Sequence, residues 1–155
     1  QEEAKVQEAA LKERQIRERD KQIINIEKIK NTTERLVEFM EQHPQVEKTI
    51  YPFSKSFPQY ELAKKQMRWC GGLFTIHLSA KNVAEVEKFC NSLKRFVFAV
   101  SWGGHESLLM PACAFYPKDN FDSSVYTFNT IRFYIGLEEP ETLIDDLKQA
   151  FSKIA

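Results

Sequence analysis

The chain has 155 residues, of which 43% are hydrophobic and 28% are charged, and this is the make-up of one globular domain with its own core. Lysine plus arginine and aspartate plus glutamate both total 22, so no net charge favours nucleic acid or an anionic membrane as a partner. No apolar run approaches the roughly 20 residues that span a bilayer, and the first residues have no signal-peptide pattern. We therefore expect a cytoplasmic protein.

Residues 1–30 are densely charged, mixed in sign, and free of glycine and proline. Opposite charges four residues apart, such as Glu13 and Arg17, support a helix. The pattern predicts a solvated helical linker or a tail. Apolar side chains at helical spacing then continue up to a stop at Pro44. We expect the packed domain to comprise residues 31–155.

Five later segments read as strands, because they alternate in polarity or are rich in β-branched and aromatic residues. They are residues 46–51, 73–78, 96–100, 108–110 and 130–135. Three segments read as helices from their apolar spacing, and they are residues 60–67, 83–93 and 140–154. Asn82 is a plausible N-cap, and Pro140 suits a first helical turn. The alternation predicts a two-layer α/β sandwich with helices on one face and a partner domain on the other. Periodicity leaves the strand order open.

Two stretches hold the polar residues on which a functional hypothesis rests. Residues 96–100 read as a short buried strand that delivers Ser101 and Trp102 to its own end, where two glycines let the backbone bend. In the second stretch, Arg132 lies inside a strand-like run. A lone arginine between apolar residues either faces solvent or holds an anion, because a guanidinium is almost never buried unpaired.

Cysteine and histidine spacing gives no sign of a disulfide framework or a metal site. Cys70, Cys90 and Cys113 are an odd number without close spacing, which favours reduced thiols. The paired short spacings of a zinc site are missing, so we expect no metal.

The two polar stretches resemble the end of the cysteine and methionine metabolism family of pyridoxal phosphate (PLP) enzymes, the trans-sulfuration enzymes. An S-x-G-G-x-E-S-L turn matches residues 101–108, and an I-R-x-x-x-G-L-E segment matches residues 131–138. Further matches, in the family's order, are residues 43–52, 70–76 and 143–147. The resemblance implies the C-terminal small domain of these enzymes, with a mainly antiparallel sheet of about four strands.

The resemblance also implies PLP, a sulfur amino-acid substrate and a homotetrameric parent enzyme. The family's large domain, which carries the Schiff-base lysine, has no counterpart in residues 1–155. The chain alone is therefore expected to contain no catalytic residue and to be inactive.

By the same resemblance, Arg132 binds the substrate carboxylate, and Ser101 hydrogen-bonds near that carboxylate and the cofactor. The form Ser-Trp-Gly-Gly is similar to that of cystathionine beta-lyases, in which the ring of Trp102 lines the substrate side. Simpler readings stay open, because Arg132 could lie on an exposed edge, Ser101 could cap a turn, and Trp102 could fill a gap.

The resulting hypothesis is a domain of a carbon-sulfur beta-lyase that acts on cystathionine or a related thioether. A relative of cystathionine gamma-synthase or methionine gamma-lyase is one alternative. A non-catalytic binding or assembly module, with residues 1–30 mediating self-association, is another.

Overall fold

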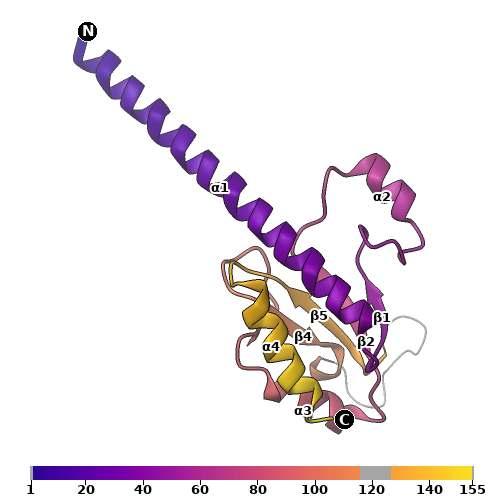
Figure 1. Ribbon diagram of the computed structural model, residues 1–155. Coiled ribbons are helices and arrows are strands. Elements are labelled where there is room, and N and C mark those ends of the chain that lie inside the picture. Colours follow the sequence, from indigo (N-terminus) through magenta and orange to yellow (C-terminus); the bar gives the residue numbers. More distant parts are fainter. Residues whose placement is uncertain (1, 116–126, 155) are drawn as a thin grey trace.

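The computed structural model describes residues 2–115 and 127–154 of the chain (Figure 1). Its helices are α1 (Glu2–Gln42), α2 (Tyr60–Gln66), α3 (Val83–Ser92), the short 3-10 helix η1 (Ala112–Ala114) and α4 (Pro140–Phe151). Its strands are β1 (Val46–Ile50), β2 (Leu73–Leu78), β3 (Val97–Phe98), β4 (Leu108–Pro111) and β5 (Thr130–Tyr134). None of the described helices is both long and apolar enough to cross a membrane.

The strands form one sheet in the order β1-β2-β5-β4-β3. All neighbouring pairs are antiparallel except β3 and β4, which run parallel. The central strand β5 therefore lies between β2 and β4, and the edges are β1 and β3. This arrangement brings the segment that begins at Thr130 next to the segment that follows the turn at residues 101–107.

The core lies between one face of the sheet and helices α1, α3 and α4 (Figure 1). Phe133 of β5 is fully buried there, stacked on Phe74 with ring centroids 5.2 Å apart and meeting Phe96 edge-on at 5.3 Å. Aromatic pairs of this kind add to the stabilisation that burial already provides. Phe133 thus fixes the central strand against its neighbours.

Helix α1 attaches to the domain only through its C-terminal part, and the rest extends away from it (Figure 1). The described side chains from Gln7 to Glu27 are exposed, and the first buried side chain is Thr32. Lys28 pairs with Glu139 at 2.6 Å, just before α4 begins. Helix α1 is thus one continuous helix, with a charged and solvated N-terminal part and a packed C-terminal part.

Helix α4 is tied to the connection between α3 and β3 by a buried carboxylate. Asp146 is 6% exposed and accepts hydrogen bonds from the backbone N–H groups of Lys94 and Arg95 at 2.8–3.0 Å. These are donors that the irregular segment after α3 would otherwise leave unpaired. Asp146 therefore fixes the start of the segment that leads into β3.

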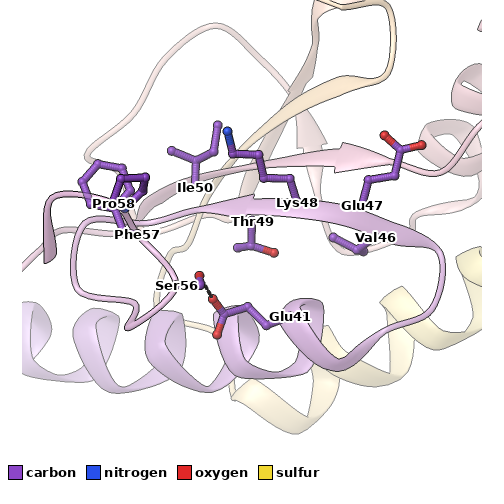
Figure 2. A pocket seen from close by; sticks show the side chains of 9 residues that line it. All are labelled: Glu41, Val46, Glu47, Lys48, Thr49, Ile50, Ser56, Phe57 and Pro58. Carbon is purple, nitrogen blue, oxygen red and sulfur yellow. Dashed lines mark hydrogen bonds between the residues drawn. The ribbon is translucent and has the colours of Figure 1, made fainter.

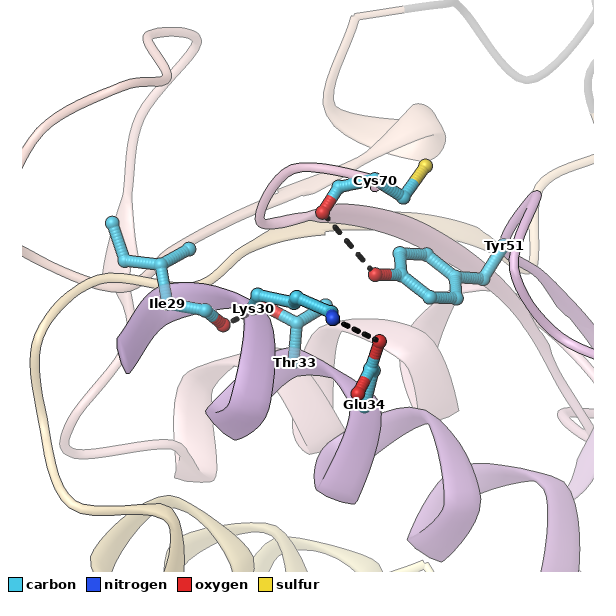
Figure 3. Close-up of polar contacts among 6 residues, drawn as sticks. All are labelled: Ile29, Lys30, Thr33, Glu34, Tyr51 and Cys70. Atoms are coloured by element: carbon cyan, nitrogen blue, oxygen red, sulfur yellow. Dashed lines mark hydrogen bonds and ion pairs between the residues drawn. The ribbon is translucent and has the colours of Figure 1, made fainter. Parts of the chain in front are cut away.

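The segment before β2 is held by Tyr51, which is almost fully buried and points its hydroxyl toward Cys70 (Figure 3). Its hydroxyl donates to the carbonyl of Cys70 at 3.4 Å, and burial raises the pKa of this phenol. Gly72 follows, and a Cβ there would come within 2.7 Å of the Ile135 carbonyl oxygen. The glycine in this stretch therefore serves close packing of the backbone.

The fold class expected from the sequence is confirmed: an α/β domain with a long N-terminal helix, a mainly antiparallel sheet and helices packed on one face. All five segments read as strands are strands, one more than the family resemblance implied. The helix starts at Asn82 and Pro140 are also confirmed, since the side chain of Asn82 caps Glu85 N at 3.0 Å.

The expectation of a buried strand over residues 96–100 is wrong beyond its first residue. Phe96 is buried, but Val97, Phe98 and Val100 are 48%, 55% and 58% exposed. The physical reason is position: β3 is an edge strand with a neighbour on one side only. Apolar composition alone does not reveal which strand ends up at an edge.

Candidate functional site

The alternation of strand β5 decides which way Arg132 points. Ile131 and Phe133 on either side of it are fully buried in the core. Because successive side chains of a strand point to opposite faces, Arg132 lies on the face of the sheet away from the helices. Its neighbours across the sheet are Thr75 of β2 and Met110 of β4.

A pocket of about 470 Å³ opens on this face around Arg132. Its lining is formed by Thr75, Val100, Met110, Ala112, Phe115, Thr130 and Arg132. Arg132 alone is charged among these described residues, and the others offer two hydroxyls and apolar surface. A largely apolar pocket with one guanidinium suits a small organic anion.

The guanidinium of Arg132 is held by the backbone at the start of the turn. Its Nη2 donates to the carbonyl of Val100 at 2.6 Å. No carboxylate in the described part of the chain pairs with Arg132. The sequence left two partners open for Arg132, solvent or an anion, and the structure adds a backbone carbonyl as a third. This one bond leaves the other N–H groups of the guanidinium available.

Ser101 and Trp102 follow directly after the Val100 carbonyl. Ser101 is exposed, and its side chain makes no hydrogen bond to another described residue. Trp102 is 66% exposed and is not among the described residues that line the pocket. Arg132 and the start of the turn are therefore adjacent, while the roles of Ser101 and Trp102 stay predictions.

Exposed apolar side chains occur in the pocket lining, in β3 and at the start of the turn, and we call them the apolar patch. They are 45–66% exposed and comprise Val97, Phe98, Val100, Trp102 and Phe115. The rings of Phe98 and Phe115 stack with centroids 6.1 Å apart. Large apolar side chains gathered on a surface mark a contact region.

The residues that join the two polar stretches were missed in the sequence. Ser107 is fully buried, and its backbone N–H and hydroxyl donate to the two carboxylate oxygens of Glu138 at 2.8 and 2.7 Å. Leu137 N donates to the carbonyl of His105 at 2.8 Å. The family pattern contains Ser107 and Glu138, but nothing in their spacing indicates that they meet.

A second pocket, of about 480 Å³, lies along the edge strand β1 and was not predicted (Figure 2). Figure 2 shows Thr49 on the side of β1 that faces α1, and Lys48 on the opposite side. Near Thr49, Glu41 of α1 accepts hydrogen bonds from the hydroxyls of Ser54 and Ser56. These contacts tie the loop after β1 to the end of α1.

The three cysteines have free thiols, and burial raises the pKa of each. For Cys90 burial raises the pKa to about 12, with a smaller contribution from the neighbouring Cys113. Because the thiolate is the reacting form, we expect alkylation of Cys90 by iodoacetamide at pH 8 to be roughly a thousandfold slower than in the unfolded chain. Mass spectrometry of a labelling time course, with and without denaturant, measures this. Equal rates in both conditions would contradict the burial of Cys90.

The family described as "Cys/Met metabolism PLP-dependent enzyme" matches residues 23–152. An L-methionine gamma-lyase of Treponema denticola is 39% identical over 137 residues, which cover 84% of this chain and 33% of that enzyme. A cystathionine gamma-lyase of Bos taurus is 41% identical over 119 residues, covering 74% of this chain and 29% of the relative. An L-alanine/L-glutamate racemase of Wolbachia pipientis is 32% identical over 125 residues, covering 80% and 31%. The aligned part of the chain thus spans about a third of the length of these relatives.

Proposed function

The chain belongs to the family of Cys/Met metabolism PLP-dependent enzymes, and from this premise we propose that residues 31–155 are the C-terminal small domain of a carbon-sulfur lyase. Its substrate is cystathionine or a related thioether amino acid. Residues 1–30 are the charged helical linker that precedes this domain. The activity requires the family's large domain, so we expect residues 1–155 alone to be inactive.

The observation that carries the proposal is the guanidinium of Arg132 at an otherwise uncharged pocket. Every amino-acid substrate has a carboxylate, and a planar guanidinium binds a carboxylate with two parallel hydrogen bonds. Within the described residues, Arg132 makes no ion pair that a substrate would have to displace. This arrangement favours carboxylate capture over a structural ion pair.

The residues of the pocket fit the substrate better than they fit the cofactor. PLP enzymes hold the cofactor through a lysine amine, and none of the described residues that line the Arg132 pocket is a lysine. When bound, PLP supplies an electron sink for cleavage of bonds at the α carbon of an amino acid. The present residues would bind the carboxylate of that amino acid.

The role of this chain is orientation. Arg132 fixes the substrate carboxylate and hence the direction of the bonds at the α carbon. The Val100 carbonyl, 2.6 Å from Nη2, restrains the guanidinium before the substrate arrives. Ser101 is next in sequence, and its exposed hydroxyl would donate to or accept from the same carboxylate or the cofactor.

The proposed partner at this face is the large PLP-binding domain. Val100 and Phe115 of the apolar patch line the pocket, Phe98 stacks on Phe115, and these side chains are exposed in the described chain. Contact with a second domain would bury these side chains and exclude water from the reacting atoms. We expect the parent enzyme to be a homotetramer, as the family resemblance implies.

The bond that is cleaved separates three versions of the proposal. The Ser-Trp-Gly-Gly turn favours a beta-lyase, whereas two of the three relatives named above are gamma-lyases. With uptake of water and release of ammonia in both cases, beta-elimination of cystathionine yields homocysteine and pyruvate, while gamma-elimination yields cysteine and 2-oxobutyrate. Gamma-replacement, as in a cystathionine gamma-synthase, yields neither oxo acid.

The test uses the polypeptide encoded by the complete coding sequence that contains residues 1–155. We expect a visible absorbance band of bound PLP that changes on addition of cystathionine, with release of thiol and one oxo acid. The identity of the oxo acid selects between beta- and gamma-elimination. A protein without this band, or one that turns over no thioether amino acid, would overturn the proposal.

A further inference from the structure

The turn that precedes β4 lacks internal support. Residues 100–106 are all exposed, and Gly103 has a φ of +87°, a conformation that glycine adopts readily. One end of the turn is held by the bond from Arg132 to the Val100 carbonyl. The contacts at the other end, which include those of Gly104, His105 and Ser107, therefore help to set where Ser101 stands relative to Arg132.

The other end is held by Ser107, which forms hydrogen bonds in three directions. Its N–H and hydroxyl both donate to Glu138, and its Oγ accepts from the N–H of Gly136 at 2.9 Å. Its carbonyl accepts from Val97 N of β3 at 2.9 Å. A fully buried hydroxyl that donates and accepts at once allows little choice of geometry.

Glu138 in turn belongs to the segment that carries Arg132. Strand β5 ends at Tyr134, and the carboxylate lies four residues further on. Tyr134 itself donates to the carbonyl of Gly104 at 3.0 Å, so the two segments touch along their length. A shift of Ser107 would move the turn relative to Arg132.

We propose that Ser107 and Glu138 are positioning residues that set the location of Ser101 and the Val100 carbonyl relative to the guanidinium of Arg132. This inference rests on the proposed function, because its consequence is the capture of a substrate carboxylate. Neither residue touches the substrate. Each acts through the turn.

Two substitutions break this pair in different ways. Ser107→Ala removes the hydroxyl and leaves Gly136 N–H without its acceptor, and Glu138→Leu leaves the buried Ser107 N–H unpaired. Glu138→Gln is the conservative variant, because its amide oxygen can still accept from the Ser107 backbone N–H. The Ser107 Oγ would then accept from the amide nitrogen as well as from Gly136 N–H, and only the hydroxyl proton loses its acceptor. We expect this variant to retain the position of the turn.

The experiment measures KM for cystathionine in the full-length enzyme, together with amide hydrogen exchange at residues 104–107 and 134–138. We expect Ser107→Ala and Glu138→Leu to raise KM about tenfold and to speed exchange in both segments. Glu138→Gln should keep KM and exchange close to the wild-type values. In an Arg132→Leu background, Ser107→Ala should raise KM less than it does in the wild-type enzyme, because the guanidinium relative to which it sets the turn is gone.

A matched control is Ser54→Ala, which removes the hydrogen bond of another buried serine to a glutamate, the exposed Glu41, at the opposite edge of the sheet. We expect it to leave KM and exchange at both segments unchanged. Faster exchange without a change in KM would overturn the positioning role, and so would a rise in KM that is additive with Arg132→Leu.

Failure of the proposed function is distinguishable from failure of this inference. A wild-type protein that turns over no thioether amino acid overturns the function alone. In that case amide hydrogen exchange still tests the inference. If the amides of Ser107 and Leu137 exchange equally fast in Glu138→Leu and in Glu138→Gln, the pair does not hold the turn.

Discussion

Replacing Arg132 with leucine in the full-length enzyme is expected to lower kcat/KM for cystathionine about a hundredfold, mainly by raising KM. A charge-assisted pair of hydrogen bonds to a carboxylate is worth about 2–3 kcal/mol, which corresponds to this factor. The fold should survive, because Arg132 lies on the face away from the helices and, within the described residues, its side chain bonds one backbone carbonyl. Steady-state kinetics with varied cystathionine measure the effect.

Two further variants sharpen this test. Arg132→Lys keeps the charge but loses the fork, so an intermediate loss is expected if the two-pronged geometry matters. Arg19→Leu removes an exposed arginine from the part of α1 that extends from the domain, and it should leave KM unchanged. Unchanged kinetics in Arg132→Leu would overturn its assignment as the carboxylate-binding residue.

The orientation of Arg132 could be predicted from the sequence because it depends on local rules. A strand alternates its side chains, and Ile131 and Phe133 are apolar, so the residue between them must face away from the core. The structure adds that Val100 supplies an acceptor. That contact joins residues 32 positions apart, and no periodicity encodes it.

The hydrogen bonds between Ser107 and Glu138 could not be predicted, because they too join residues that are far apart in the sequence. They depend on β4 lying beside β5, and strand order is a property of the whole sheet. A serine after a glycine turn has an ordinary local explanation as a turn residue, and a glutamate just before a helix suits the positive end of the helix dipole. Only the register that sets Leu108 opposite Tyr134 brings them together.

The exposure of residues 97–100 also could not be predicted from the local sequence. An apolar run predicts burial, but a domain can bury such a run only against something that covers it. Among the described strands, none lies beyond β3 in the sheet, and Val97 and Phe98 remain half exposed. The run was thus correctly read as apolar and strand-like, and its exposure is one of the reasons for proposing a second domain at this face.

Gly136→Ala is expected to have the largest effect on stability among these variants. A Cβ at Gly136 would lie 2.2 Å from the carbonyl oxygen of His105 and 2.6 Å from the carbonyl carbon of Glu106. Both are backbone atoms, so no side chain can rotate away to make room. We expect the free energy of unfolding to fall by about 3 kcal/mol, the upper part of the range for overpacking.

Gly71→Ala is the matched control, since a Cβ there would meet only the ring of Trp69, at an ordinary 4.0 Å. It should leave stability unchanged or raise it by about 0.5 kcal/mol, because alanine restricts the unfolded chain. Urea unfolding of both variants measures the difference.

The backbone can accept the new methyl at Gly136 only by moving residues 105–106 away from β5, which would also displace Ser107 from Glu138. Gly136→Ala should therefore raise KM as Ser107→Ala does, and a variant with wild-type stability and KM would contradict the tight contact between the two segments.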